Sequence, residues 1–200
     1  MSIVGKLHAS SVFPRRVTRL VELIGGLLPE GARVLDIGSG DGSIAALIMK
    51  ERSDVKIEGI DVLVRNDTKI PTKEFDGRTI PFTDATFDVA MFVDVLHHTD
   101  DPEQLMKEAA RVSRHAVVIK DHLMHGPISG ATLRFMDYVG NAHHGVRLPY
   151  NYLSPERWEE LYRVARLKPG KTVSELRLYP WPASVIFDSN LHFISVLQKQ

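Results

Sequence analysis

The chain contains no cysteine among its 200 residues. Disulfide bonds, thiolate–metal sites and cysteine nucleophiles are therefore excluded. Long apolar runs are missing as well, since no stretch approaches the ~20 apolar residues that a membrane-spanning helix needs. The first residues, Met1–Lys6, lack the apolar core of a signal peptide. We therefore expect a cytoplasmic protein without a membrane span.

An excess of charge of either sign is also absent. The chain has 25 Lys and Arg and 25 Asp and Glu, so its formal net charge is zero, and no basic cluster stands out. Nucleic-acid binders usually carry a basic stripe, so this composition favours a small-molecule partner over DNA or RNA. Without repeats, low-complexity tracts or linkers, 200 residues at 44% hydrophobic content predict one domain with a substantial core. The oligomeric state stays open.

The order of apolar patterns indicates an α/β protein. A helix is predicted over residues 12–28 from the apolar stripe that starts at Val17. Predicted strands follow at 32–37, 55–60, 70–75, 87–93 and 116–120, with helices at 43–51 and 102–113 between them. Such alternation predicts a parallel sheet flanked by helices. Ligands in this architecture bind at the carboxyl ends of the strands.

The second half of the chain is less regular. Residues 122–153 form a long connection rich in glycine and proline, which predicts a lid insertion on the substrate side. At most a helical turn is expected inside it, at residues 134–139. Ser154 and Pro155 then predict the start of another helix. Two closing strands are expected at 173–179 and 191–198.

A glycine-rich turn is the most informative local feature. The segment Val34–Gly42 runs from apolar residues into Asp36 and then places three glycines at alternate positions. Glycine permits a positive φ and leaves no Cβ between the backbone and a ligand. The spacing is G-x-G-x-G rather than the G-x-G-x-x-G of dinucleotide folds, and Asp41 inside the turn would repel a pyrophosphate. Asp36 and Asp41 instead favour a positively charged ligand.

Three later segments add to this turn. Asp61 ends the second predicted strand about 20 residues after the turn, where a carboxylate meets ribose hydroxyls in nucleotide-binding folds. Acids and apolar residues follow in Phe75–Ala90, and then comes Asp94–Pro102. In this order the motifs resemble those of class I S-adenosylmethionine-dependent methyltransferases, in particular the small-molecule (type 11-like) group. The resemblance covers about residues 20 to 120.

The resemblance implies a fold. It is a doubly wound, Rossmann-like sheet of seven mostly parallel strands, with an antiparallel last strand. Between its second and third strands the family usually carries a full helix. Here only Val62–Lys69 is available, so we expect that helix to be reduced or missing. Residues 1–28 are expected to form an N-terminal helical cap, and the whole of 1–200 a single methyltransferase domain.

The resemblance also implies S-adenosylmethionine as cofactor and a set of residues that contact it. Asp36, Gly38, Ser39 and Gly40 would meet its methionine end, Asp61 its ribose, Val62, Asp76 and Gly77 its adenine, and Asp94 and Val95 the floor under the methionine. The residues themselves leave structural alternatives open. Asp36 and Asp41 could cap the following helix, and Asp76-Gly77 forms turns in many proteins.

Two histidines are candidate catalytic residues, His97 and His122. Histidine titrates near neutrality and can take a proton in a transition state, although His97 could instead orient the cofactor or fill the pocket wall. His122-x-x-His125 has only Asp121 as a nearby oxygen donor and no third ligand set, so no metal is expected.

The sequence therefore predicts methyl transfer from S-adenosylmethionine to a small-molecule acceptor, with a marginal preference for a hydroxyl. Two alternatives remain. A non-catalytic cofactor-binding homologue is compatible with the shortened region after Asp61. A nicotinamide-dependent oxidoreductase would share the turn and the ribose acid, but Asp41 and the missing third fingerprint glycine argue against it. The sequence does not identify the acceptor.

Overall fold

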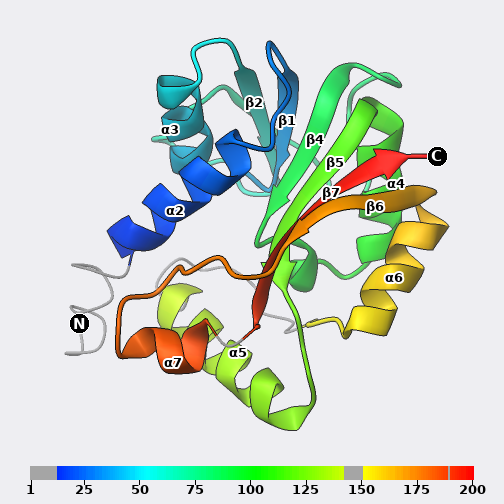
Figure 1. The fold of residues 1–200 in the computed structure, drawn as a ribbon. Helices are drawn as coiled ribbons and strands as arrows, with labels where there is room; N and C mark the ends of the chain where they lie inside the picture. Colours follow the sequence, from blue (N-terminus) through cyan, green and yellow to red (C-terminus); the bar gives the residue numbers. More distant parts are fainter. Residues whose placement is uncertain (1–12, 142–150, 189) are drawn as a thin grey trace.

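The sheet has the topology expected from the resemblance. The computed structural model describes residues 13–141, 151–188 and 190–200. In it, seven strands form one sheet in the order β3-β2-β1-β4-β5-β7-β6 (Figure 1). The strands are β1 (Arg33–Ile37), β2 (Lys56–Asp61), β3 (Thr72–Glu74), β4 (Phe87–Val93), β5 (Ser113–His122), β6 (Leu167–Val173) and β7 (His192–Lys199). β7 runs antiparallel to β5 and β6, and the other neighbours pair in parallel.

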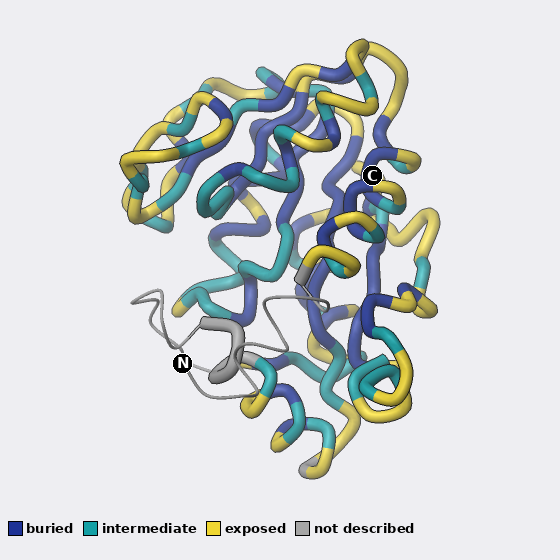
Figure 2. The backbone as a smooth tube through the Cα atoms, turned by 90° about the vertical axis from the view of Figure 1, so that its left-hand side faces the viewer, coloured by how far each residue is buried: buried dark blue, intermediate teal, exposed yellow. Residues whose placement is uncertain are grey.

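Helices cover both faces of the sheet. α2 (Phe13–Gly25) and α3 (Ser43–Glu51) lie on one face, and α4 (Pro102–Val112) and α6 (Pro155–Val164) lie on the other (Figure 1). Successive residues of β1 point to opposite faces of the sheet. Val34 packs in the core beneath α2 and α3, and Leu35 packs in the core beneath α4 and α6. Strands buried on both sides are nearly continuous runs of apolar residues, and Figure 2 shows them as the dark interior of the chain trace.

Further elements lie beyond the carboxyl ends of the strands. α5 (Pro127–Asn141) and α7 (Ala183–Phe187) sit below the sheet in Figure 1, where β5 ends and β7 begins. The short 3-10 helix η2 (Leu96–His98) follows β4 at the same edge. The connection from β2 to β3, residues 62–71, contains no helix, as expected. No helix within the described residues is both long enough and apolar enough to cross a membrane.

The interpretation of residues 122–153 as an irregular connection was wrong for its first half, which forms the 15-residue helix α5. Glycines obscured the pattern. A Cβ at Gly130 would come within 3.3 Å of the Met124 sulfur, so this glycine lies inside a helix, closely packed against Met124, rather than in a turn. Residues 142–150 of the predicted lid lie outside the described residues, as do residues 1–12 of the predicted N-terminal cap.

The predicted strand at 173–179 was also misplaced, because the strand is β6 at Leu167–Val173. Pro169 and Gly170 resemble a turn, yet they lie inside the strand at an irregularity in its pairing with β7. β6 pairs with β7 alone and forms the edge of the sheet, which is where proline is tolerated.

Candidate functional site

The glycine turn follows β1 and is closed on one side and open on the other. Gly38 and Ser39 donate their N–H groups to Ile60 O at 2.8 and 3.2 Å, which ties the turn to the end of β2. Gly38 and Gly40 have φ of 73° and 60°, respectively. A Cβ at Gly38 would lie 2.7 Å from a methyl of Val95, whereas a Cβ at Gly40 would meet nothing within 4 Å. The turn therefore rests on Val95 and exposes backbone at Gly40.

Asp61 lies directly at the open side of this turn. One of its carboxylate oxygens accepts from Gly40 N–H at 2.8 Å, and the other accepts from Leu63 N–H at 2.9 Å. These two bonds orient the carboxylate, and each oxygen has a second lone pair for another donor. A diol bound beside Gly40 would find a fixed double acceptor.

Asp36 is a buried acid next to Asp61. Burial raises its pKa to about 7, and the negative charge of Asp61 adds to the effect. Asp36 is therefore close to half-protonated at neutral pH. A cation bound at the turn would favour the ionised form.

Asp41, by contrast, serves the following helix. Its carboxylate accepts from both the N–H and the hydroxyl of Ser43, at 3.0 and 2.5 Å. Burial opposes ionisation of Asp41, but the Ser43 bonds outweigh it and lower its pKa. Asp41 thus holds the first residue of α3 from outside the helix, whereas the N-cap position itself is Gly42, which has no side-chain cap.

The next predicted residues lie at the end of β3. Phe75 N–H donates to Asp61 O at 3.1 Å, which brings Asp76 and Gly77 to the edge formed by β2. Asp76 accepts from the N–H groups of Arg78 and Thr79 and so closes a turn; these bonds lower its pKa. A Cβ at Gly77 would be 3.1 Å from a methyl of Val62. Val62 itself is 57% exposed, so an apolar surface borders this turn.

Asp94, after β4, belongs to a buried ion cluster. Its φ of 58° is uncommon for a residue other than glycine. Arg16 of α2 and Lys120 of β5 both donate to its carboxylate. Burial acts to raise the pKa of Asp94, but Lys120 and Arg16 outweigh burial and hold it well below its usual range. The cluster fastens α2 to the carboxyl ends of two central strands.

The two candidate histidines meet at Asp121. His97 Nδ1 lies 2.6 Å from a carboxylate oxygen of Asp121, and His122 Nδ1 lies 3.3 Å from the same oxygen. Burial and the positive charge of Lys120 lower the pKa of His122 to about 4. His122 is therefore neutral under physiological conditions.

The structure adds residues to this region that sequence reasoning missed. His192, at the start of β7, pairs in register with His122, and their ring centroids are 4.8 Å apart. Tyr152 stacks on His97 at 5.3 Å. Arg16 and Lys120 also belong to these missed residues, since both donate to the Asp94 carboxylate. No local motif marks these residues, because each comes from a different element and only the sheet edge brings them together.

His97, Asp121 and His122 offer ligand atoms within 4.8 Å of one another, a grouping that differs from the His122 and His125 pair considered from the sequence. The surroundings favour a hydrogen-bonded network over a cation site. The Asp121 oxygens already accept from three N–H groups, those of Leu96, His122 and the His97 ring, and the ammonium group of Lys120 adds positive potential. We assign no metal to this cluster.

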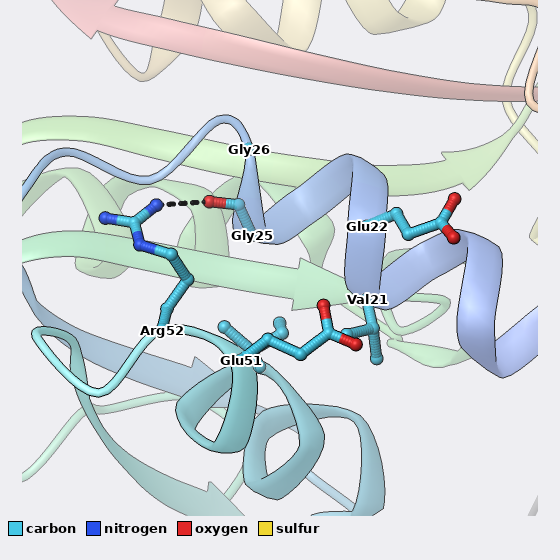
Figure 3. A pocket seen from close by; sticks show the side chains of 7 residues that line it. Val21, Glu22, Gly25, Gly26, Glu51 and Arg52 are labelled. Atoms are coloured by element: carbon cyan, nitrogen blue, oxygen red, sulfur yellow. Dashed lines mark hydrogen bonds between the residues drawn. The ribbon is translucent and has the colours of Figure 1, made fainter.

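A surface hollow of about 240 Å³ lies elsewhere, between the carboxyl ends of α2 and α3 (Figure 3). Arg52 on its rim donates to Gly25 O at 2.7 Å. The glycine turn lies at the start of α3, whereas Glu51 and Arg52 lie at the end of the same helix. At a rise of about 1.5 Å per residue, the length of α3 separates the turn from the hollow by about 13 Å. The hollow contains none of the predicted site residues.

The sheet order, the antiparallel last strand and the glycine turn beside a strand-end acid define the class I methyltransferase fold. The chain belongs to the methyltransferase domain family, whose model matches residues 9–165. It is 32% identical to the 27-O-demethylrifamycin SV methyltransferase of Amycolatopsis mediterranei in an alignment of 120 residues that covers 52% of this chain and 44% of that protein. It is 28% identical to the demethylmenaquinone methyltransferase of Thermotoga maritima over 152 residues, 68% of this chain and 66% of that one.

The chain thus spans less than half the length of the rifamycin relative. Among solved structures, it is similar to the 1,6-didemethyltoxoflavin-N1-methyltransferase of Burkholderia thailandensis, with a TM-score of 0.64 and 16% identity. That match covers 92% of this chain and 78% of the other. At this identity the likeness concerns the fold.

The open side of the turn can be tested by substituting Gly40 with alanine. A side chain there would occupy the space beside the exposed backbone, so cofactor binding should weaken about tenfold or more. Gly31→Ala is a matched control, because Gly31 also has a positive φ and open space for a Cβ but lies before β1. Both variants should lose about 1 kcal/mol of stability through backbone strain. Calorimetric titration with S-adenosylhomocysteine would measure binding; equal affinities in the two variants would contradict the assignment of Gly40.

Proposed function

We propose that this chain transfers a methyl group from S-adenosylmethionine to a small-molecule acceptor in the cytoplasm. The observation that carries the proposal is the hydrogen bond from Gly40 N–H to the Asp61 carboxylate, which joins an open glycine turn to a double acceptor. The family supports it. Relatives named for rifamycin and demethylmenaquinone substrates support a small acceptor, and neutral net charge argues against a nucleic acid.

The residues at the turn fit the parts of this cofactor. Asp61 would accept from the ribose hydroxyls, and the backbone of Gly38, Ser39 and Gly40 would approach the methionine end. Asp36 would ionise beneath its positive charge, and Asp94 and Val95 would form the floor. Val62, Asp76 and Gly77 would surround the adenine. The similar toxoflavin methyltransferase was solved with bound S-adenosylhomocysteine, which supports the same ligand class here.

When bound, S-adenosylmethionine supplies an activated methyl group on a sulfonium leaving group. The chain must hold the acceptor in line with that group, exclude water and, where the acceptor carries a proton, remove it. We assign proton removal to His97, which has a carboxylate partner. His122, whose pKa is lowered to about 4, is a weak base and is assigned to the wall of the site.

The acceptor would bind between the strand ends and the elements that cover them. In this proposal the 122–153 insertion forms the substrate-side lid, and α5 and Tyr152 are its described parts. α2, fastened by Arg16, is the described part of the 1–28 cap. The described elements converge on the edge that carries His97 and His122.

Removing the Asp61 carboxylate is the direct test. Asp61→Ala should weaken S-adenosylmethionine binding at least tenfold in isothermal titration calorimetry, because two charge-assisted hydrogen bonds to ribose are lost. Asp67→Ala, an exposed acid in the same connection, should bind as the natural protein does.

Three outcomes separate the competing hypotheses. The absence of binding heat with S-adenosylmethionine and S-adenosylhomocysteine in the natural protein would remove the proposal. Binding of reduced nicotinamide cofactor, seen by its fluorescence, would favour the oxidoreductase. Cofactor binding without any methylated product across a broad acceptor panel would favour the non-catalytic homologue.

A further inference from the structure

His192 is a buried imidazole whose two ring nitrogens have different surroundings. It is the first residue of β7 and is 2% exposed. Its Nδ1 lies 3.4 Å from the ammonium nitrogen of Lys120. An ammonium group only donates hydrogen bonds, so Nδ1 accepts and the hydrogen of the neutral ring is on Nε2. His192 therefore presents an N–H group on the nitrogen that does not face Lys120.

This Nε2–H group is a buried donor without a hydrogen-bond partner among the described residues. Most buried side-chain polar atoms in proteins are paired, because burying a donor without an acceptor costs free energy. His192 lies where β7 begins and β5 ends, at the edge of the sheet where ligands bind in this architecture. The unpaired donor therefore indicates a partner atom that a ligand brings.

The charges around His192 indicate the kind of partner atom. Arg16, Lys120 and Asp94 act on its ring, and they form the ion cluster described above. Burial and the positive charge of Lys120 hold the pKa of His192 well below its usual range, so the ring is neutral. Two cations and one carboxylate leave a positive potential at the ring. An oxygen that accepts a hydrogen bond fits this position, and an ammonium group does not.

The rings around His192 indicate the shape of the ligand. The His122 ring lies 4.8 Å from that of His192, and the Tyr179 ring lies 5.8 Å from it at an interplanar angle of 28°. Aromatic rings stack on other rings with an offset or meet them edge to face. A flat, conjugated molecule that carries a carbonyl oxygen matches both the rings and the donor.

A series of contacts connects His192 to the proposed cofactor site. His192 pairs in register with His122, and the His122 ring lies 4.7 Å from that of His97. Val95, two residues before His97, supports Gly38 of the glycine turn. The donor thus belongs to the same edge as the proposed cofactor site and lies on the strand that enters last.

The segment that covers His192 has few buried contacts. The ring of Tyr179 lies 5.5 Å from that of Phe187 in α7, and no residue of α7 is fully buried. Figure 1 shows α7 beside the start of β7. Segments with few buried contacts open at a low cost in free energy. A ligand can therefore reach Nε2 by displacing Tyr179 and α7.

We propose that His192 is a specificity-determining residue whose Nε2–H donates a hydrogen bond to a carbonyl oxygen of a flat, conjugated methyl acceptor. This proposal rests on the proposed function and deepens it. His192 transfers no proton and helps to hold the acceptor in line with the methyl group. An acceptor without the carbonyl leaves the donor buried and unpaired, so the site selects against it.

The ring tautomer provides the first test. Long-range ¹H–¹⁵N spectra of the histidine rings would be recorded for the full chain between pH 6 and pH 8. We expect a neutral His192 with its proton on Nε2 throughout. A proton on Nδ1, or a protonated ring at pH 7, would overturn the proposal. The measurement needs neither cofactor nor turnover, so its result does not depend on the proposed function.

Ligand preference provides the second test. 7-Hydroxychromone and 7-hydroxycoumarin are flat bicyclic phenols with a carbonyl, and 2-naphthol is a counterpart without one. In calorimetric titrations with S-adenosylhomocysteine present, we expect at least one carbonyl compound to bind about tenfold or more tightly than 2-naphthol. His192→Phe should remove this preference by weakening the carbonyl compound alone. His192→Gln keeps an N–H group and should restore part of it. A purely structural role would change all three affinities alike.

His115→Phe is the matched control, because His115 lies near the other end of β5 with a side chain that is 62% exposed. It should leave all three affinities unchanged. The inference is overturned if neither carbonyl compound binds more tightly than 2-naphthol, or if the preference persists in a folded His192→Phe variant. With S-adenosylhomocysteine bound, either result removes the role of His192 and leaves the proposed function standing. Failure of the natural protein to bind S-adenosylhomocysteine would instead remove the proposed function.

Discussion

Replacing Asp94 with asparagine is expected to lower the free energy of unfolding by about 3 kcal/mol or more, the scale of breaking a buried ion pair. Lys120 is completely buried and donates to Asp94, so the substitution leaves a buried ammonium group without its counter-charge. Asparagine tolerates the positive φ at this position. The loss of stability therefore measures the effect of removing the negative charge rather than backbone strain. Urea denaturation near pH 6 would measure it.

The pH dependence of that loss distinguishes charge from packing. Burial lowers the pKa of Lys120, and without Asp94 that pKa falls further. As pH rises, Lys120 in the folded variant therefore loses its proton. The destabilisation caused by a buried, unpaired ammonium group then decreases. We expect the difference from the natural protein to be largest near pH 6 and smaller near pH 9.

Two further variants complete the experiment. Asp84→Asn is the control, because the Asp84 side chain is 79% exposed and forms an ion pair with Arg111. Exposed ion pairs contribute about 0–1 kcal/mol to stability. Lys120→Met added to Asp94→Asn removes both charges and should recover most of the lost stability. A double variant as unstable as the single one would show that Asp94 acts through packing, not through Lys120.

The half of the site proposed to bind the cofactor could be predicted from the sequence because its chemistry is local. The turn at Gly38 and Gly40 follows directly on a buried strand, and Asp61 ends the next strand. In a parallel sheet, the ends of neighbouring strands meet at one edge. Strand identity and order along the chain were therefore enough to predict that Asp36 and Asp61 lie near one another and that Asp76 follows the strand next to β2.

The acceptor half could not be predicted in the same way. Arg16, Lys120 and His192 come from three separate elements, and their neighbourhood depends on the sheet order and on the antiparallel entry of β7. Lys120 sits at the end of an apolar strand, where the pattern gives no sign of a buried ion. The roles of Pro169 and Gly130 were hidden similarly, because edge position and helix packing, respectively, override their usual turn-forming tendency.

Asp36→Asn is expected to make the protein more stable at neutral and higher pH. The carboxyl group has a pKa near 7 when folded and about 3.9 when unfolded. Below about pH 4 it is protonated in both states. As pH rises from 4 to 7, only the unfolded state ionises, so the natural protein loses stability, and above 7 the loss is constant. The difference in pKa corresponds to about 4 kcal/mol at about 1.4 kcal/mol per pH unit.

Asparagine has no proton to lose and escapes this penalty. Urea denaturation of Asp36→Asn at pH 5, 7 and 8 should show a gain over the natural protein that grows toward pH 7 and then levels off. Asp41→Asn provides a control of opposite sign, because the pKa of Asp41 is lowered in the fold and its ionised form stabilises the structure. Equal stability of Asp36→Asn and the natural protein at pH 8 would show that the fold does not raise the pKa of Asp36.

The same substitution should weaken cofactor binding. A sulfonium or ammonium group near Asp36 lowers its pKa by favouring the carboxylate, so binding near pH 6 should release a proton. Titrations in two buffers with different ionisation enthalpies measure that release, which Asp36→Asn should abolish. A variant that is more stable but binds more weakly would show that the buried acid is retained for its ligand at a cost to the fold. Equal proton release in both proteins would assign the proton to another group.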